Sequence, residues 1–82
     1  MFYEKGNIVE LEDNKRYFIY DQTDYNNRKF LLLVNVDNND DIDIFELSSK
    51  DNDAFISEVE DTNLKAELST IFEKNNNENS EQ

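Results

Sequence analysis

The chain has 82 residues, of which 20 are acidic and 8 are basic, so its formal net charge is −12. It contains no cysteine, histidine or proline and a single glycine, which excludes disulfides, thiolate zinc sites, histidine-based catalysis and glycine-rich phosphate loops. The length predicts one small domain with a correspondingly small hydrophobic core.

The first half of the chain is predicted to form strands joined by tight turns. "GNIVEL" (residues 6–11) is a short apolar stretch, and "EDNK" (residues 12–15) follows it as a turn. "RYFIYDQ" (residues 16–22) is aromatic and β-branched, which is typical of a strand. The asparagine pair in "TDYNNR" (residues 23–28) tolerates the positive φ angles that a tight hairpin needs.

The most apolar segment is "KFLLLVNVD" (residues 29–37), and it predicts a central strand. Alternate residues from Phe30 to Val36 are apolar on one face, and Leu31 and Leu33 are apolar on the other. The next strand, "IDIFEL", changes the phase of its alternation. A β-bulge near Ile44–Phe45 would keep its apolar residues inward, and a strand that is apolar on both faces is the alternative.

The last third of the chain predicts a loop, a short strand and a helix. "SSKDND" reads as a loop, and "AFISEVED" (residues 54–61) as a short edge strand. In "DTNLKAELSTIFEK" (residues 61–74), apolar residues recur at i, i+4, i+7 and i+8, which indicates one helical stripe. Asp61 or Thr62 is expected to cap the helix by accepting a backbone N–H. The stripe consists of Leu64, Leu68, Ile71 and Phe72.

Strands followed by a helix indicate the α+β class. We predict an antiparallel meander of four to five strands with one C-terminal helix packed on one face. The alternative is a small SH3-like barrel with the helix outside. Residues 1–74 would form the domain, and residues 75–82, which contain no apolar side chain, would be a disordered polar tail.

The sequence predicts a cytoplasmic protein that does not enter a membrane. Its longest apolar run, residues 30–34, is far shorter than the roughly 20 residues needed to cross a bilayer. Its first residues, "MFYEKGN", lack the charged and then apolar layout of a signal peptide.

The acidic stretch "DNNDDIDIFE" (residues 37–46) invites comparison with a calcium loop. An EF-hand that began at Asp37 would need glycine at its sixth position and glutamate at its twelfth, but these positions hold Ile42 and Ser48. We therefore expect a solvated hairpin loop and no metal site, with weak calcium binding by the loop aspartates as the alternative. Those aspartates are Asp37, Asp40, Asp41 and Asp43.

The sequence offers no catalytic or cofactor-binding residues. Paired carboxylates catalyse acid–base reactions when an apolar cleft raises one pKa, and no acidic residue here stands in an apolar frame. We therefore expect no cofactor and no enzymatic activity.

The charge is concentrated in the second half of the chain. Residues 1–36 hold 6 acidic and 5 basic residues, a net of −1, whereas residues 37–82 hold 14 and 3, a net of −11. This balance opposes direct binding to nucleic acid and favours a protein partner with a basic surface. The oligomeric state stays open. The predicted partner-binding acidic surface is Asp37, Asp40, Asp41, Asp43, Glu46, Asp51 and Asp53.

Two further groups of residues have a functional and a structural interpretation. The tyrosines could line a binding face or pack in the core. The basic residues could bind an anionic surface or pair with nearby acids, which adds little stability. The tyrosines are Tyr3, Tyr17, Tyr20 and Tyr25. The basic residues are Lys15, Arg16, Arg28 and Lys29.

The succession of motifs resembles a known family. "KGNIVELEDNKRYFIYDQTDYNNRKFLLLVNVDN", the acidic "DIDIFEL" and the final "FISEVEDTNLKAELSTIFEK" resemble the YrzB-like small acidic proteins of unknown function from low-GC Gram-positive bacteria. The resemblance spans residues 6–74 and implies a cytosolic, non-enzymatic domain.

Two functional hypotheses follow from the charge and the resemblance. The first is a non-enzymatic protein-interaction or regulatory module. The alternative is an acidic inhibitor from a phage or mobile element that mimics nucleic acid, as anti-restriction and anti-CRISPR proteins do. The asparagine-rich composition suits a low-GC genome or its mobile elements.

Overall fold

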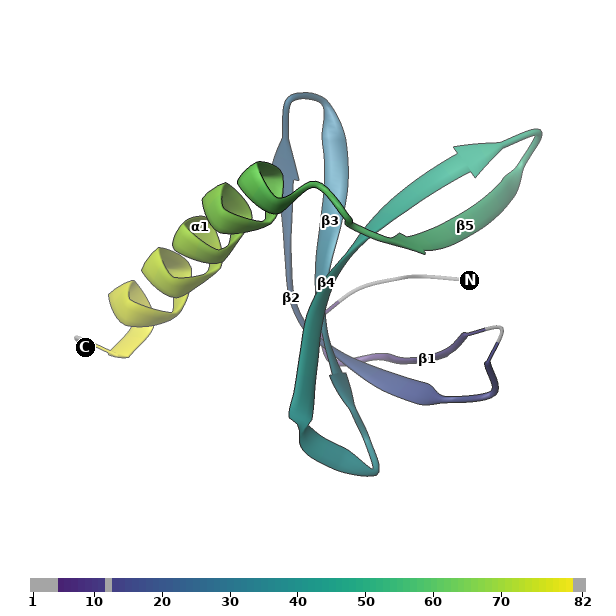
Figure 1. Cartoon of the computed structure of the whole chain (residues 1–82), viewed down its shortest axis with the longest axis horizontal. Helices are drawn as coiled ribbons and strands as arrows, with labels where there is room; N and C mark the ends of the chain where they lie inside the picture. The colour runs from purple at the N-terminus through teal and green to yellow at the C-terminus, as the bar shows by residue number, and fades with distance from the viewer. Residues whose placement is uncertain (1–4, 12, 81–82) are drawn as a thin grey trace.

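The computed structural model describes residues 5–11 and 13–80, with side chains described as far as residue 75. The elements are β1 (Ile8–Glu10), β2 (Arg16–Tyr25), β3 (Arg28–Asn35), β4 (Asn38–Lys50), β5 (Asp53–Glu58) and α1 (Thr62–Ser80). The strands pair antiparallel in the order β1-β2-β3-β4-β5, and the sheet curls into a half-barrel with α1 on its convex side (Figure 1). The predicted α+β meander with one C-terminal helix is confirmed, and its sheet is open rather than a closed barrel.

Positive φ angles mark the hairpin turns. Between β2 and β3, Asn26 and Asn27 have φ angles of 55° and 63°, and a type I′ turn requires positive φ at both central residues. Asp51 and Asn52 have φ angles of 54° and 72° between β4 and β5, and Asn14 has 65° before β2. Asparagine and aspartate tolerate this region better than other residues with a Cβ, so the turns form without glycine.

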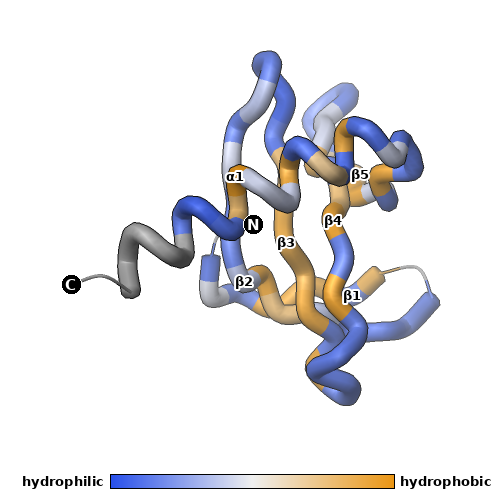
Figure 2. Tube along the Cα trace, turned by 60° about the vertical axis from the view of Figure 1, so that its left-hand side comes forward, coloured by the Kyte–Doolittle hydropathy of each residue, from blue (hydrophilic) through white to orange (hydrophobic). Residues whose placement is uncertain are grey.

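β3 is the central strand, as predicted, and Figure 2 shows that it is largely hydrophobic along its length. It contributes apolar side chains to both faces of the sheet. Leu31 and Leu33 lie on the concave side and are fully buried there. The curl of the sheet brings β1 and the start of β2 together with β4 around these leucines. We call this group the concave cluster, and it consists of Val9, Tyr17, Ile19, Leu31, Leu33 and Phe45.

The convex side of the sheet packs against α1. Leu68 is fully buried on Phe30 of β3 and Ile44 of β4, and Leu64 and Ile71 are partly buried beside it. The predicted apolar stripe of the helix is thus confirmed. We call the buried residues of this side the helix cluster, and they are Phe30, Ile44, Val59, Leu68 and Phe72.

Asp61 caps α1, as the sequence predicted. Its Oδ1 accepts hydrogen bonds from the backbone N–H groups of Asn63 at 3.0 Å and Leu64 at 3.2 Å. These N–H groups have no acceptor within the helix, so the cap satisfies donors that would otherwise need water. α1 then continues to Ser80, where we expected a disordered tail from residue 75. No glycine or proline interrupts residues 75–80, so nothing in the backbone ends the helix earlier.

The predicted bulge at Ile44–Phe45 is wrong. β3 and β4 keep one register from Val34–Ile42 to Lys29–Leu47. Ile44 lies in the helix cluster and Phe45 in the concave cluster, so the alternative of a strand that is apolar on both faces holds. The register shifts lie elsewhere, after Ile19 in β2 and at the turn between β3 and β4.

β5 confirms the short edge strand that we predicted within residues 54–61. It pairs with β4 only from Phe45 to Lys50. Its side chains are exposed except for the partly buried Ile56. Among the described residues, no helix is long and apolar enough to cross a bilayer.

Candidate functional site

The acidic stretch 37–46 coincides with the part of β4 that lacks a strand on its outer side. β5 pairs with residues 45–50 of β4, and in the described part of the chain no strand pairs with the outer edge of residues 38–43. An open edge exposes hydrogen-bonding groups to other chains, and charged side chains discourage such pairing. The charges of this stretch therefore oppose the pairing of another strand with the open edge.

Asp41 is partly buried and hydrogen-bonded within the fold. Its Oδ2 accepts a hydrogen bond from the Asn35 side-chain amide at 3.2 Å and a longer one from the Tyr17 hydroxyl at 3.4 Å. Asn35 is buried and also accepts a hydrogen bond from the backbone N–H of Asp37. Burial, followed by the negative charge of Asp41, raises the pKa of Tyr17. This network closes the turn between β3 and β4.

Asp43 is engaged by the helix. Its Oδ1 lies 2.9 Å from Nζ of Lys65 in α1 and accepts the backbone N–H of Ile44 at 2.8 Å. Burial disfavours its charged form, but these two hydrogen bonds, a hydrogen bond with Glu58 and the charge of Lys65 together lower the pKa of Asp43. Glu58 at the end of β5 has its pKa raised by a hydrogen bond to Asp43 and by the Asp43 charge. Asp43 thus ties the open edge of β4 to α1.

Glu46 forms a bidentate ion pair with Arg28 across β3 and β4. The distances are 2.8 Å from the guanidinium Nη2 to Oε1 and 2.9 Å from Nε to Oε2. The hydrogen bond from Arg28 lowers the pKa of Glu46. The guanidinium carbon of Arg28 also lies 5.1 Å from the centre of the Phe30 ring, within cation–π range.

The remaining acidic residues of the predicted surface lie at the two ends of β4. Asp37 precedes β4, Asp40 lies near the start of β4, and both are exposed. Asp51 and Asp53 are exposed at the β4–β5 hairpin. None of the four has an ion pair within the described residues. The register places Asp43 opposite Leu33 on the concave face and Glu46 opposite Phe30 on the convex face. The seven carboxylates are therefore split between two loops and two faces rather than aligned in one stripe.

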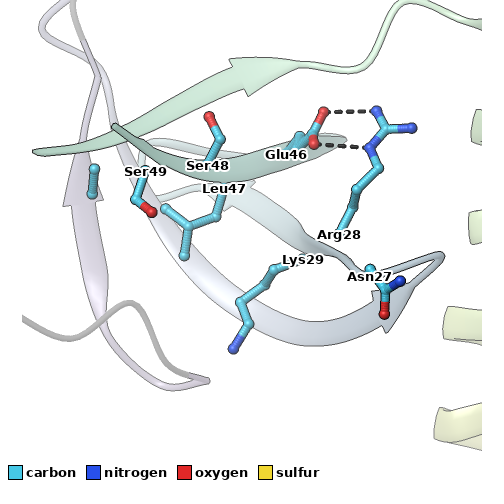
Figure 3. Close-up of a pocket in the computed structure, with 8 residues that line it drawn as sticks. Asn27, Arg28, Lys29, Glu46, Leu47, Ser48 and Ser49 are labelled. Carbon is cyan, nitrogen blue, oxygen red and sulfur yellow. Dashed lines mark hydrogen bonds and ion pairs between the residues drawn. The ribbon is translucent and has the colours of Figure 1, made fainter. Parts of the chain in front are cut away.

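An open hollow of about 500 Å³ lies where the β2–β3 turn meets β4 and β5 (Figure 3). Its titratable groups are Arg28, Lys29 and Glu46, and two of these are bound to each other. The hydrogen bond from Arg28 lowers the pKa of Glu46, which makes its carboxylate a weaker base. The hollow is lined by Asn27, Arg28, Lys29, Glu46, Leu47, Ser48, Ser49 and Ala54.

The convex side carries an apolar surface that α1 leaves open. Ile8, Phe18, Val34 and Ile42 lie opposite one another in neighbouring strands and form a row across the sheet. Tyr20, two residues after Phe18, extends the row along β2. Four of these five side chains are strongly exposed, at 57% for Ile8, 37% for Phe18, 45% for Tyr20 and 53% for Ile42. We call this surface the convex patch, and it consists of Ile8, Phe18, Tyr20, Val34 and Ile42.

The sequence analysis did not predict the convex patch. The signal was present, because β2, β3 and β4 carry apolar residues on both faces while the single helical stripe offers only four apolar side chains. One such stripe cannot cover the convex face of three long strands. A surplus of apolar strand residues over apolar helix residues would have indicated an uncovered surface.

The tyrosines divide between core and surface. Tyr17 is buried in the concave cluster, Tyr20 is exposed in the convex patch, and Tyr3 lies outside the described residues. Tyr25 is partly buried, and its hydroxyl donates a hydrogen bond to Glu67 of α1, which raises the tyrosine's pKa.

The basic residues that bracket β2 and β3 do not form one patch. Lys15 and Arg16 lie at the start of β2, and Arg28 and Lys29 lie at the start of β3, which is the opposite end of the hairpin. Arg28 is paired with Glu46.

Across the described residues, no three acidic side chains gather closely enough to hold a metal ion. No family model, curated protein or solved structure matches this chain. The resemblance to the YrzB-like group therefore stays a prediction.

Proposed function

We propose that this chain is a non-enzymatic, cytoplasmic protein-interaction module that contacts its protein partner through the convex patch. The observation that carries the proposal is the row of exposed apolar side chains from Ile8 to Ile42. Contiguous exposed apolar surface is rare on small monomeric proteins and often marks an interaction site. Tyr20 adds an aromatic side chain of the kind that is enriched at interfaces.

The composition and the ion pairs support a role in binding rather than catalysis. The chain has no histidine or cysteine, and the hollow of Figure 3 contains no free general base. Its net charge of −12 opposes binding to nucleic acid and favours a partner with a basic surface.

A matched pair of variants tests the proposal. Phe18→Ser combined with Ile42→Ser removes apolar area from the convex patch, whereas Phe55→Ser removes one exposed aromatic side chain from β5, outside the patch. In affinity capture from the source cells, the wild type and Phe55→Ser should retain the same partner, and the double variant should lose it. Urea unfolding of each variant checks that the fold is intact. If the folded double variant retains the same partner, the convex patch is not the interface.

A second proposal is an acidic inhibitor from a phage or mobile element that occupies a nucleic-acid groove. The observation that favours it is that two carboxylates at each end of β4 are exposed and have no ion pair among the described residues. Such carboxylates can stand in for phosphates in a basic groove. The split of the acidic surface between two loops restricts this mimicry to two separate contact points. The four carboxylates are Asp37, Asp40, Asp51 and Asp53.

The test of the mimic changes those four aspartates to asparagine and leaves Asp41, Asp43 and Glu46 intact, because the latter hold the fold. With a purified basic partner, the binding affinity of the variant should fall, and the dependence of affinity on salt should become shallower. An affinity and a salt dependence equal to those of the wild type would reject the mimic.

A further inference from the structure

The convex patch borders a hollow whose chemistry is mainly apolar. The hollow measures about 420 Å³ and includes Leu32, which also contacts the helix cluster. The open surface is therefore continuous with the surface on which α1 already packs. Asn39 is the polar side chain at its margin among the described residues. The hollow is lined by Phe18, Tyr20, Leu32, Val34, Asn39 and Ile42.

The open strand edges beside the patch are protected against an added strand. At the edge of β4, the carboxylate of Asp43 accepts the backbone N–H of Ile44 at 2.8 Å. In β2, the carboxylate of Asp21 accepts the backbone N–H of Gln22, also at 2.8 Å. Occupied N–H groups and charged side chains oppose edge-to-edge pairing. An occupant of the patch therefore lies on the face of the sheet and not along its edge.

The dimensions of the patch fit a short helix. Its row crosses four strands, and neighbouring strands lie about 4.8 Å apart, so the row is about 14 Å long. About ten helical residues cover that length. In α+β domains helices cover one face of an antiparallel sheet, and α1 already packs on part of this face. A second helix beside α1 would complete it.

Charge opposes a second copy of this chain as the occupant. Each copy carries a net charge of −12, so two copies repel each other. The same net charge favours a cationic occupant over an acidic one.

We propose that the convex patch binds a basic amphipathic helix of the partner protein. The helix lies beside α1 and sets apolar residues spaced i, i+3 or i+4, and i+7 on Phe18, Val34 and Ile42. Its basic residues face the solvent and complement the net negative charge of this chain. This inference rests on the proposed function and specifies the class of partner.

The test uses synthetic peptides and the full chain. The helical probe has about 14 residues, or roughly four turns, with leucines at the helical spacing and lysines elsewhere. The control peptide has the same composition with leucine and lysine in strict alternation, which is the period of a strand. Binding is followed by backbone amide NMR and by the circular dichroism of the peptide.

The helical peptide should bind, become helical and shift the amide signals of Phe18, Tyr20, Val34 and Ile42, and the alternating peptide should bind about tenfold more weakly. Ile42→Lys should weaken binding of the helical peptide at least about fivefold, because it removes apolar area and places a cation beside a lysine-rich peptide. Phe55→Ser, which removes an exposed apolar side chain outside the patch, should leave it unchanged.

Three results would overturn the inference. Equal binding of the two peptides would remove the case for a helix. Shifts confined to the aspartates at the ends of β4 would show contact by charge alone. A dimer in sedimentation that Ile42→Lys abolishes would identify a second copy as the occupant, and the interaction module would still stand. The proposed function is tested separately. It is rejected if the folded Phe18→Ser, Ile42→Ser variant captures the same partner as the wild type.

Discussion

At the scale of single residues, the acidic side chains of β4 have different roles although the sequence makes them look alike. Asp40 is exposed, whereas its neighbour Asp41 is partly buried and accepts hydrogen bonds from Asn35 and Tyr17. A buried amide that loses its acceptor retains the full cost of its desolvation. The two neighbours should therefore respond differently to the same substitution.

We expect Asp41→Ala to lower the free energy of unfolding by about 1–3 kcal/mol, because it leaves the buried Asn35 amide without its acceptor. Asp40→Ala, the control, should stay within about 0.5 kcal/mol of the wild type, as is usual for an exposed site. Urea unfolding at pH 7 measures both. Equal effects of the two substitutions would contradict the structural role of Asp41.

Glu46 gives the protein a pH dependence of known sign. Arg28 holds the pKa of Glu46 below its usual value in the folded state, so the carboxylate contributes stability at neutral pH. This contribution is present above the unfolded pKa and is lost as the pH falls through the lowered folded pKa. Glu46→Gln should therefore be less stable than the wild type at pH 7, and the difference should disappear in acid. Urea unfolding across this pH range measures it, and a difference independent of pH would contradict the ion pair.

At the scale of elements, β4 is one strand with two environments. Its second half, residues 45–50, pairs with β3 or β5 and carries the core residue Phe45. Its first half pairs with β3 on one edge, and among the described residues no strand pairs with its other edge. α1 reaches this first half through Lys65 and Asp43, and it reaches β2 through Glu67 and Tyr25. Polar contacts to β4 and to β2 thus add to the packing of the apolar stripe in holding the helix on the sheet.

Truncation of the stripe tests the docking of α1. Leu68 has no exposed surface, so Leu68→Ala should cost ~2–5 kcal/mol, which combines lost burial with the cavity left behind. Ser69→Ala, on the exposed side of the same helical turn, should change stability by less than about 0.5 kcal/mol. The midpoint of urea unfolding measures both variants. A loss below about 1 kcal/mol for Leu68→Ala would mean that the helix is not docked in solution.

The cap of α1 gives a second test at this scale. Asp61→Ala removes the acceptor for two backbone N–H groups and should cost about 0.5–2 kcal/mol. Asp61→Asn keeps a side-chain oxygen at the same position and should recover most of the stability, since asparagine caps as well as aspartate. Thermal and urea unfolding of the pair separate the cap from the charge. Equal losses in both variants would assign the effect to charge instead.

At the scale of the whole molecule, the single helix covers only part of the convex face of the sheet. The sheet buries its concave face by curling on itself and part of its convex face under α1. The rest of the convex face stays open as the convex patch. A net charge of −12 opposes the association of these exposed apolar surfaces between copies of the chain.

The distribution of carboxylates also predicts how the molecule responds to calcium. The acidic stretch lacks an EF-hand's glycine and bidentate glutamate, and Asp41 and Asp43 are already engaged by Asn35 and Lys65. Calorimetric titration at physiological salt should show no saturable calcium site tighter than about 10 μM, which is a sensor-type affinity. A single site of that affinity would falsify this prediction.

The sequence alone determined the features that depend on neighbours along the chain. Apolar residues on both faces of residues 29–37 indicated the central strand, and the stripe from Leu64 to Phe72 indicated the docked helix. Asn26–Asn27 indicated the hairpin, and Asp61 the cap. Each of these depends on a local periodicity or on the backbone preference of one or two residues, so a single sequence contains the necessary information.

Only the tertiary structure decided which apolar and acidic residues are covered. The bulge at Ile44–Phe45 was wrong because it presumed one buried face, whereas the curl of the sheet buries Phe45 and α1 buries Ile44. In the sequence Ile42 looks like Ile44 and Asp40 looks like Asp41, yet one of each pair is exposed and the other is buried or bound. The difference arises because coverage depends on where the chain after β5 places α1 and on how far β5 extends along β4, and both are contacts between segments distant in sequence.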